Sequence, residues 1–253
     1  MRRGYVQKMQ LKIRHDISEQ LILPLNYHHI IQSIIYGNLP GDGYSHQLHE
    51  NGYTTGSRQF KLFNFSLLQG RYEIAGRKIA FRESVSWEVR SPDIYMMRKL
   101  EESIWQRGLR YGEQYFMEPE LKLVDDTIET DHVLVRMLSP ICVYSTDPDT
   151  KKTCFYSPED PEFALRVNDN FMRKYIACYG VEPDSGIMIR PVAVTPRDKY
   201  VTRYKNFYVS GWMGYYRLDG RRKYLDFLYQ AGIGSRNSQG FGMFEPVNEQ
   251  SIR

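Results

Sequence analysis

The chain has 253 residues, 42% of them hydrophobic, which is enough for two domains with separate cores. Its formal net charge of +4 is too small for a protein that coats DNA, so the distribution of basic residues matters more than their total. Three cysteines without close spacing, Cys142, Cys154 and Cys178, argue against a disulfide framework or a zinc knuckle. No apolar run reaches about 18 residues, so we expect a cytoplasmic protein without a membrane-spanning helix.

The first half of the chain predicts the order β-α-β-β-α-β from its apolar periodicity. The predicted strands cover residues 5–15, 60–70, 76–91 and 109–124, and the predicted helices cover residues 27–39 and 93–108. We expect Asn26 to cap the first helix and Pro40 to end it together with Gly41. Asp93 is the expected cap of the second helix. A polar loop, residues 40–58, separates the first helix from the second strand.

Beyond a polar, acidic connector at residues 125–131, the same order of elements recurs without a visible repeat in the sequence. The predicted strands cover residues 132–145, 186–196, 206–220 and 240–249, the helices cover residues 161–180 and 222–232, and residues 151–156 form a hairpin with the first strand. Two such units in tandem are an α+β fold of two ferredoxin-like (RRM-like) domains, which we place at residues 1–124 and 132–253. That fold supports many functions, RNA binding among them.

Residues 232–242 read GIGSRNSQGFG, and four glycines at this density indicate that the backbone passes close to another group. A P-loop would need a glycine where Gln239 stands and a lysine that the loop lacks. A dinucleotide fingerprint would need a glycine where Asn237 stands and a helix after the loop, whereas this loop follows a predicted helix. Both mononucleotide interpretations are therefore disfavoured.

A helix C-cap at Gly232 and a tight turn at Gly240–Gly242 explain part of the glycine pattern without any ligand. They do not require the polar residues SRNSQ between the glycines. A flexible polar loop that carries Arg236 and several backbone donors fits a phosphodiester backbone better.

The glycine-rich segment resembles the C-terminal signature of the CRISPR repeat-processing endoribonucleases, which reads glycine-apolar-glycine, five residues, glycine-apolar-glycine. The matching positions are Gly232, Ile233, Gly234, Gly240, Phe241 and Gly242. Four further segments resemble this family, namely LPLNYHHIIQSIIYGNL at 23–39, LHE at 48–50, KLFNFSLL at 61–68 and LSPICV at 138–143. The family has two ferredoxin-like domains, in agreement with the predicted order of elements.

The resemblance implies that repeat RNA is cut without a metal. The ribose 2′-hydroxyl attacks the adjacent phosphate and leaves a 2′,3′-cyclic phosphate and a free 5′-hydroxyl. This chemistry needs a group that takes the nucleophile's proton, one that protonates the leaving oxygen, and positive charge at the phosphorane. In the family these are a tyrosine, a histidine and a lysine, and the matching catalytic positions are Tyr36, His49 and Lys61.

The position of Tyr36 in the predicted helix agrees with this role. It lies on the polar side, with His29, Gln32 and Ser33, so it should face a cleft rather than the core. The pKa of a free tyrosine is about 10, so Tyr36 would need a nearby cation such as Lys61 to lower that pKa before it could act as a base.

His49 lies in the predicted polar loop and belongs to a residue type that titrates near neutrality. His46 is the nearest competitor, and we prefer His49 because it alone stands in the LHE context. The division of acid and base roles between Tyr36 and His49 stays open. The pair His46 and His49 lacks further ligands, and Asp147 with Asp149 lacks the rest of a calcium loop, so we expect no metal and no cofactor.

Candidate RNA-binding residues come from the glycine-rich loop and from basic segments of the second domain. From the loop they are Gly232, Gly234, Arg236, Asn237, Ser238, Gly240 and Gly242, and from the basic segments Arg190, Arg197, Lys199 and Arg203. Basic residues continue to Lys223, and interleaved with them are tyrosines that could stack on unpaired bases, namely Tyr200, Tyr204, Tyr208, Tyr215 and Tyr216. The alternative for the basic segments is a merely solvated surface.

The sequence therefore predicts an endoribonuclease that cleaves CRISPR precursor RNA within repeats and yields guide RNAs. The expected partner is repeat RNA. By resemblance, further candidate partners are other subunits of a CRISPR effector complex and a second copy of the chain. We expect no association with a membrane. One alternative is a non-catalytic repeat-RNA-binding subunit of such a complex. A more distant alternative is a nucleotide-dependent enzyme that uses the glycine-rich loop.

Overall fold

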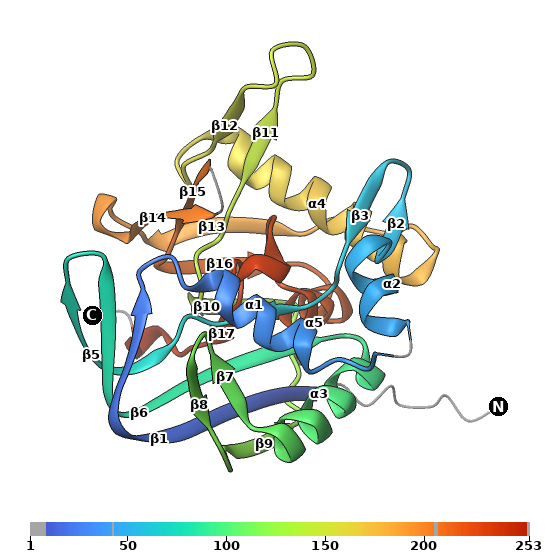
Figure 1. The fold of residues 1–253 in the computed structure, drawn as a ribbon. Helices are drawn as coiled ribbons and strands as arrows, with labels where there is room; N and C mark the ends of the chain where they lie inside the picture. The colour runs from blue at the N-terminus through green and yellow to red at the C-terminus, as the bar shows by residue number, and fades with distance from the viewer. Residues whose placement is uncertain (1–8, 42, 205–206, 252–253) are drawn as a thin grey trace.

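The five-stranded antiparallel sheet carries the N-terminal half of the chain (Figure 1). The computed structural model describes residues 9–41, 43–204 and 207–251, so the expected start of the first strand, at residues 5–8, lies outside the described residues. The strands of this sheet are β1 (Met9–Pro24), β4 (Asn64–Phe65), β5 (Gln69–Ala75), β6 (Lys78–Ser91) and β9 (Glu120–Val124). Their order is β4-β6-β1-β9, and β5 also pairs with β6.

The second sheet carries the C-terminal half of the chain. Its strands are β10 (His132–Met137), β13 (Met188–Ala193), β16 (Tyr215–Asp219) and β17 (Phe244–Pro246), in the order β13-β16-β10-β17. The helices are α1 (His28–Gly37), α2 (Tyr44–Glu50), α3 (Ile94–Arg107), α4 (Pro161–Tyr179) and α5 (Arg222–Ala231). The paths β1-α1-β4-β6-α3-β9 and β10-α4-β13-β16-α5-β17 are two ferredoxin-like units, as predicted. The domain limits 1–124 and 132–253 stay a prediction.

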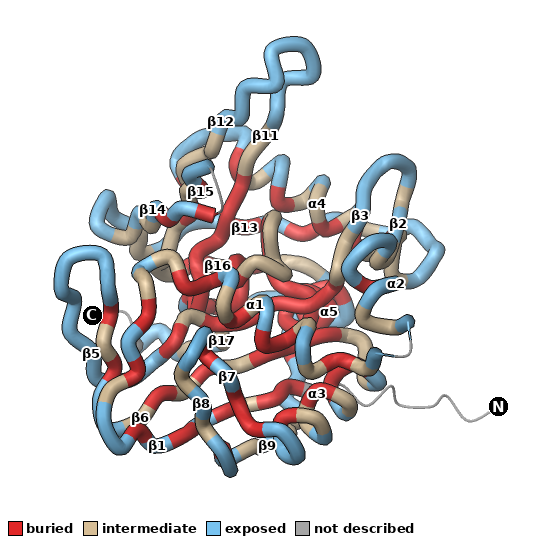
Figure 2. The backbone as a smooth tube through the Cα atoms, in the orientation of Figure 1, coloured by how far each residue is buried: buried red, intermediate tan, exposed pale blue. Residues whose placement is uncertain are grey.

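Period-two alternation explains the central strand β1. Leu11, Ile13 and His15 are buried, whereas Arg14, between Ile13 and His15, is exposed. Leu11 lies opposite Val89 of β6. The helices that cover the sheets are amphipathic in the same sense, as α1 shows by burying Ile31, Ile34 and Ile35. Figure 2 shows buried segments along the strands of both sheets and exposed hairpin tips.

Helix starts were predicted with mixed success. Asp93 does cap α3, because its carboxylate accepts a hydrogen bond from the backbone N–H of Met96. The expected cap Asn26 is wrong, since α1 begins after Tyr27, whose side chain is buried and makes no capping bond. Its hydroxyl instead accepts from the backbone N–H of Leu68, so tertiary packing of Tyr27 decides where the helix begins.

Several segments predicted as single loops or single strands contain additional helices or hairpins in the structure. The loop expected at 40–58 contains α2 and a hairpin, and the strand expected at 109–124 is a hairpin followed by β9. The hairpins are β2 (Tyr53–Thr55) with β3 (Arg58–Phe60), β7 (Leu109–Tyr111) with β8 (Gln114–Phe116), β11 (Tyr144–Thr146) with β12 (Thr153–Phe155), and β14 (Lys199–Tyr204) with β15 (Phe207–Trp212). Three short 3₁₀ segments are η1 (Pro196–Asp198), η2 (Asn237–Gln239) and η3 (Glu249–Ser251).

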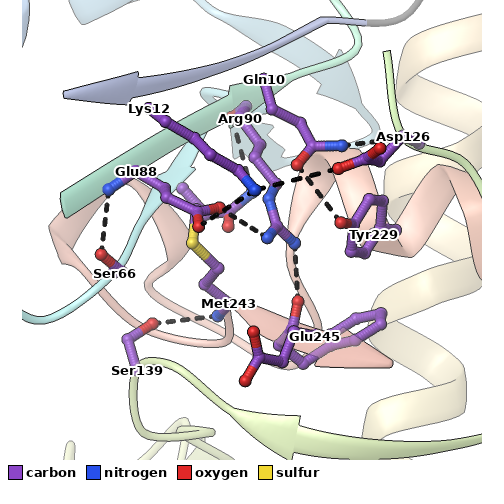
Figure 3. A network of polar contacts seen from close by, with 12 residues as sticks. Gln10, Lys12, Ser66, Glu88, Arg90, Asp126, Ser139, Tyr229, Met243 and Glu245 are labelled. Carbon is purple, nitrogen blue, oxygen red and sulfur yellow. Dashed lines mark hydrogen bonds and ion pairs between the residues drawn. The ribbon is translucent and has the colours of Figure 1, made fainter. Parts of the chain in front are cut away.

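A buried arginine joins the two halves (Figure 3). Arg90 of β6 donates from Nη1 to the carbonyl oxygen of Phe244 at 2.6 Å and from Nη2 to Glu88 at 2.7 Å. Its guanidinium lies 4.0 Å from the ring centroid of Tyr229 on α5. A buried charge is tolerated only when it is paired and hydrogen-bonded, so these contacts hold the halves in one arrangement. Among the described residues, no helix is both long and apolar enough to cross a membrane.

Candidate active site and nucleic-acid interface

The three predicted catalytic residues lie together although they come from different elements. Tyr36 stands in the last turn of α1, His49 on α2, and Lys61 just after β3. The rings of Tyr36 and His49 meet edge to face with centroids 5.1 Å apart. The ammonium of Lys61 donates a hydrogen bond to the backbone carbonyl oxygen of His49. The fold thus brings together the three residues that the sequence predicts to be catalytic.

His49 lies on a helix and not in the loop that the sequence predicted. Helix α2 begins after Gly43, whose φ of 95° is accessible to glycine without strain. The His49 side chain is 62% exposed, and its Nδ1 lies 2.8 Å from Oε1 of Glu50. This contact leaves Nε2 as the nitrogen available for proton exchange with a ligand. The described ring contacts place His49, and not the competing His46, against Tyr36.

The environment of Tyr36 opposes a role as base. Its ring also packs edge-on against Phe63, at 5.5 Å between centroids. Burial raises the pKa of the Tyr36 hydroxyl well above its usual value, instead of the lowering that a base would need. Burial lowers the pKa of the Lys61 ammonium, and the nearby Glu50 carboxylate partly offsets this lowering. The Tyr36 hydroxyl is therefore neutral at physiological pH.

A cavity of about 270 Å³ lies between Lys61 and the glycine-rich loop. Its basic lining residues are Arg58, Lys61, Lys174 and Arg236. Its other lining residues are Gln59, Phe60, Leu62, Tyr144, Asn170, Ser235, Asn237, Ser238 and Gln239. Within the described part of the chain no carboxylate lines this cavity, so its field favours an anionic ligand. It connects the predicted catalytic lysine with the predicted binding residues Arg236, Asn237 and Ser238.

The glycines of the loop have a structural role. Gly232, Gly234, Gly240 and Gly242 are all buried and all have positive φ. A Cβ at Gly234 would lie 2.8 Å from the carbonyl oxygen of Cys142, and one at Gly240 would collide with the ring of Phe65. The close approach that the glycines permit is therefore with the protein itself. The prediction that their backbone touches RNA stays a prediction, and their burial does not favour it.

The loop docks on the helix that carries Tyr36. Nδ1 of His28 donates to the carbonyl oxygen of Gln239 at 2.8 Å, and the amide of Gln32 donates to that of Ser238 at 2.7 Å. His28, Gln32 and Tyr36 stand four residues apart, so they share one face of α1. Burial lowers the pKa of His28 to about 4, so its ring is neutral and Nε2 can accept a hydrogen bond.

The tyrosines of β14 face the same helix. Tyr200 lies with its hydroxyl 3.0 Å from Nε2 of His28, and Tyr204 donates to Oε1 of Gln32 at 2.6 Å. The hydroxyls of Tyr200 and Tyr204 thus serve the contact between the two units, and stacking of their rings on RNA bases stays a prediction. Tyr208 is 71% exposed and stays a candidate for stacking.

The C-terminal model of the family described as CRISPR associated protein Cas6 matches residues 118–246, more than half of the chain. This chain belongs to the Cas6 family. The CRISPR-associated endoribonuclease Cas6 1 of Methanocaldococcus jannaschii is 24% identical over 255 residues, covering 97% of this chain and 95% of that protein.

Two solved structures share the fold of this Cas6 family member. One, described as the characterization of a Cas6-related gene from Pyrococcus furiosus, has a TM-score of 0.83 at 21% identity and covers 96% of this chain and 100% of that one. The other, described as an RAMP protein binding different RNA substrates, has a TM-score of 0.80 at 20% identity and covers 95% and 100%. At these identities the likeness is one of fold.

The predicted basic residues of this Cas6 chain divide into two groups. Lys199 and Arg203 are exposed on β14 beside Arg197 in η1, and the ammonium of Lys199 lies 5.9 Å from the ring of Trp212. Arg190 stands on the edge strand β13 and pairs with Asp219 at 2.8 Å. Lys199 and Arg203 lie on the hairpin that contacts α1 and Arg197 directly precedes it, whereas Arg190 lies on another strand, and RNA binding by all four stays a prediction.

Arg236 is the loop residue best placed to meet an anion. Its guanidinium lies 4.8 Å from the ring centroid of Tyr144 and 5.1 Å from that of Phe207. Its Nη1 donates to the side chain of Gln239 at 3.1 Å, while its Nε is buried without a partner. Arg236 also has a φ of 60°, which is unusual for a residue other than glycine and concentrates strain at this point of the cavity.

Sequence reasoning missed Lys174 and the docking role of His28. Lys174 continues the buried stripe of α4 formed by Phe163, Val167 and Phe171, and a lysine in an apolar stripe is a signal that the sequence displays. A cavity of about 480 Å³ lies on the other side of α1, beside β7 and β8, and none of the predicted residues is among the described residues that line it. Among the described residues, no cluster of three or more His, Cys, Asp or Glu side chains is arranged for a metal ion.

Proposed function

We propose that this Cas6 family member is an endoribonuclease that cleaves CRISPR precursor RNA within its repeats. The observation that carries the proposal is the convergence of Tyr36, His49 and Lys61 beside a cavity lined by basic residues without a carboxylate. The family membership and the name of the Methanocaldococcus relative support the same activity. The cleavage proceeds without a metal and leaves a 2′,3′-cyclic phosphate.

The environments of the three side chains suggest their roles. Nε2 of His49 takes the proton of the 2′-hydroxyl as the bond from O2′ to phosphorus forms. Tyr36, kept neutral by burial, transfers its hydroxyl proton to the 5′-oxygen as the bond from phosphorus to that oxygen breaks. The proton that His49 has taken then returns to Tyr36 through solvent, which restores both side chains. Lys61 has three ammonium hydrogens, of which one is used by His49, so the others can stabilise the phosphorane oxygens.

The test is cleavage of the cognate repeat RNA in EDTA, with the wild type beside His49→Ala. We expect the wild type to release a cyclic phosphate and a 5′-hydroxyl, and a 2′-deoxy substitution at the cleaved nucleotide to abolish the reaction. Loss of wild-type activity in EDTA would contradict metal independence, and an undiminished rate for His49→Ala would contradict the role of His49.

Tight repeat binding without any cyclic-phosphate product would instead favour the non-catalytic RNA-binding subunit. Partners other than RNA stay predictions. Light scattering of the free protein, and of the protein with repeat RNA, measures whether a second copy of the chain joins the complex.

A further inference from the structure

A lysine is buried inside the second unit, directly under the glycine-rich loop. Lys174 is 1% exposed and follows Phe171 in the apolar stripe of α4. Its ammonium donates to the carbonyl oxygens of Gly232 at 2.5 Å and Gly234 at 3.1 Å, and to Oδ1 of Asn237 at 2.9 Å. An ammonium has three hydrogens, so the three oxygens match the charged form of Lys174 and exceed what a neutral amine can satisfy.

The three oxygens belong to the part of the loop that determines its shape. Asn237 donates from Nδ2 to the carbonyl oxygens of Ile233 at 3.1 Å and Phe241 at 3.0 Å, which closes the loop upon itself. Between these anchors stand Arg236 in the cavity and Ser238, which accepts a hydrogen bond from α1. Holding Asn237 and the two glycine carbonyls therefore sets where Arg236 and Ser238 lie.

The charge of Lys174 is costly to maintain where it lies. Burial lowers its pKa to about 7. The charged groups around the shared cavity are Arg58 and Lys61 from the β3 segment and Arg236 from the loop, with the titratable Tyr144 from β11. Among the described residues no carboxylate balances Lys174 there. A phosphate entering this cavity would favour the protonated lysine, so binding of an anion and protonation of Lys174 should reinforce each other.

We propose that Lys174 is a positioning residue, whose ammonium holds the glycine-rich loop in the conformation that presents Arg236 to the RNA phosphates and docks the loop on α1 beside Tyr36. This inference rests on the proposed function for its RNA contacts, but the control of loop conformation can be tested without RNA. An apolar side chain would fill the same space at lower cost, so the three bonds to loop oxygens are the reason for a lysine here.

The first experiment follows amide hydrogen exchange in the protein alone, with the wild type, Lys174→Met and the matched control Val167→Ala. Val167 is buried on the same stripe of α4, and its apolar side chain cannot donate a hydrogen bond to the loop. All three proteins are compared well below their unfolding temperatures. We expect exchange across residues 232–242 to become about tenfold faster in Lys174→Met only, because three loop acceptors lose their donor. Equal exchange in Lys174→Met and the wild type overturns the proposal.

A second variant keeps the lysine and moves its titration, which guards against a Lys174→Met protein that does not fold. Asn170 stands one turn before Lys174, lines the same cavity, and has a buried Oδ1 without a partner. Asn170→Asp places a carboxylate near the ammonium with almost no change of shape. In the wild type, the glycine-rich loop should lose its protection against hydrogen exchange as Lys174 loses its proton. In Asn170→Asp the midpoint of this loss should lie at a pH about 1 unit higher. An unshifted midpoint contradicts control by Lys174.

The third measurement uses repeat RNA in single-turnover cleavage between pH 6 and pH 9. We expect the ratio of wild-type to Lys174→Met rates to be largest, about tenfold, below pH 7 and to approach one as the lysine loses its proton. A purely structural lysine would give a ratio independent of pH, which overturns the proposal. If the wild type does not cut RNA at all, the proposed function fails, while the exchange experiments still decide the role of Lys174.

Discussion

Tyr36 and His49 come from two helices, yet their rings lie edge to face with centroids 5.1 Å apart. The contact depends on α2, a seven-residue helix that buries only Leu48. Thus His49 is held by a short element at the surface, while Tyr36 is anchored on Phe63 in the core. A catalytic group on a lightly anchored helix can move to meet its substrate, whereas its partner stays in place.

Replacement of His49 tests the assignment of the base. We expect His49→Ala to reduce the single-turnover cleavage rate by about a hundredfold or more, because a positioned proton acceptor is lost. His46→Ala is the matched control, since His46 is exposed on the same helix but stands one turn earlier. Equal losses in the two variants would show that the helix, and not the imidazole of His49, is what cleavage needs.

Tyr36→Phe separates the hydroxyl of Tyr36 from its ring. The ring contacts with Phe63 and His49 persist in the variant, so the melting temperature should stay close to that of the wild type. The cleavage rate should fall by about tenfold or more through loss of one hydrogen-bond donor in the transition state. Rate and melting temperature are measured on the same preparation. A rate equal to that of the wild type removes Tyr36 from the chemistry.

Arg236→Gln should weaken RNA binding and reduce its dependence on salt. Removing one cation that meets a phosphate lowers the slope of log affinity against log salt by about 1. Arg190→Gln is the control, because Arg190 already pairs with Asp219 on an edge strand away from the cavity lining. The measurement is a filter-binding or anisotropy titration at several salt concentrations. A larger effect of Arg190→Gln would instead place the RNA along strand β13, which carries Arg190.

Gly240→Ala should destabilise the contact between the two units. An added Cβ collides with the ring of Phe65 and lies 2.9 Å from Nδ1 of His28, and the φ of 85° adds strain. We expect a loss of about 2 kcal/mol or more in the free energy of unfolding. At Gly37 a Cβ meets nothing within 4 Å, so Gly37→Ala should leave stability unchanged or slightly higher. Urea titrations of both variants give the comparison.

The buried His28 predicts a stability that depends on pH. Burial lowers its pKa from 6.5 to about 4 in the folded chain, so between these values the unfolded chain binds more protons. The free energy of unfolding should therefore fall as the pH drops from 6.5 toward 4, by about 3 kcal/mol from this residue. His28→Gln should reduce that slope by about half, because burial also lowers the pKa of His15 to about 4. His29→Gln, on the exposed side of α1, should leave the slope unchanged. Urea unfolding at several pH values measures both slopes.

The regular elements could be read from the sequence because their signals are local. Asp93 caps α3 as predicted, since a cap needs only a side chain three residues before the amide it accepts from. Helix α2 was missed because its seven residues carry no apolar repeat. The start of α1 was misplaced because burial of Tyr27 against the segment around Leu68 decides it, and that contact joins residues far apart in the chain.

The residues of the candidate site were found by resemblance, but their surroundings were not. The spacing of the four glycines is visible in the sequence, as is the lysine within the apolar stripe of α4. Neither pattern tells what the neighbouring atoms are. The glycines contact protein and Lys174 contacts loop oxygens, and both facts follow from packing between segments about 60 to more than 200 residues apart.

By itself the sequence determined two β-α-β-β-α-β units, the family signature, and which side chains can carry proton transfer, because periodicity, spacing and side-chain chemistry are properties of the chain alone. Only the tertiary structure decided that Tyr36 is half-buried and neutral, that His49 faces it from a separate helix, and that the glycine-rich loop lies against α1. Desolvation and non-local hydrogen bonds produce these features, and both exist only once distant segments pack together.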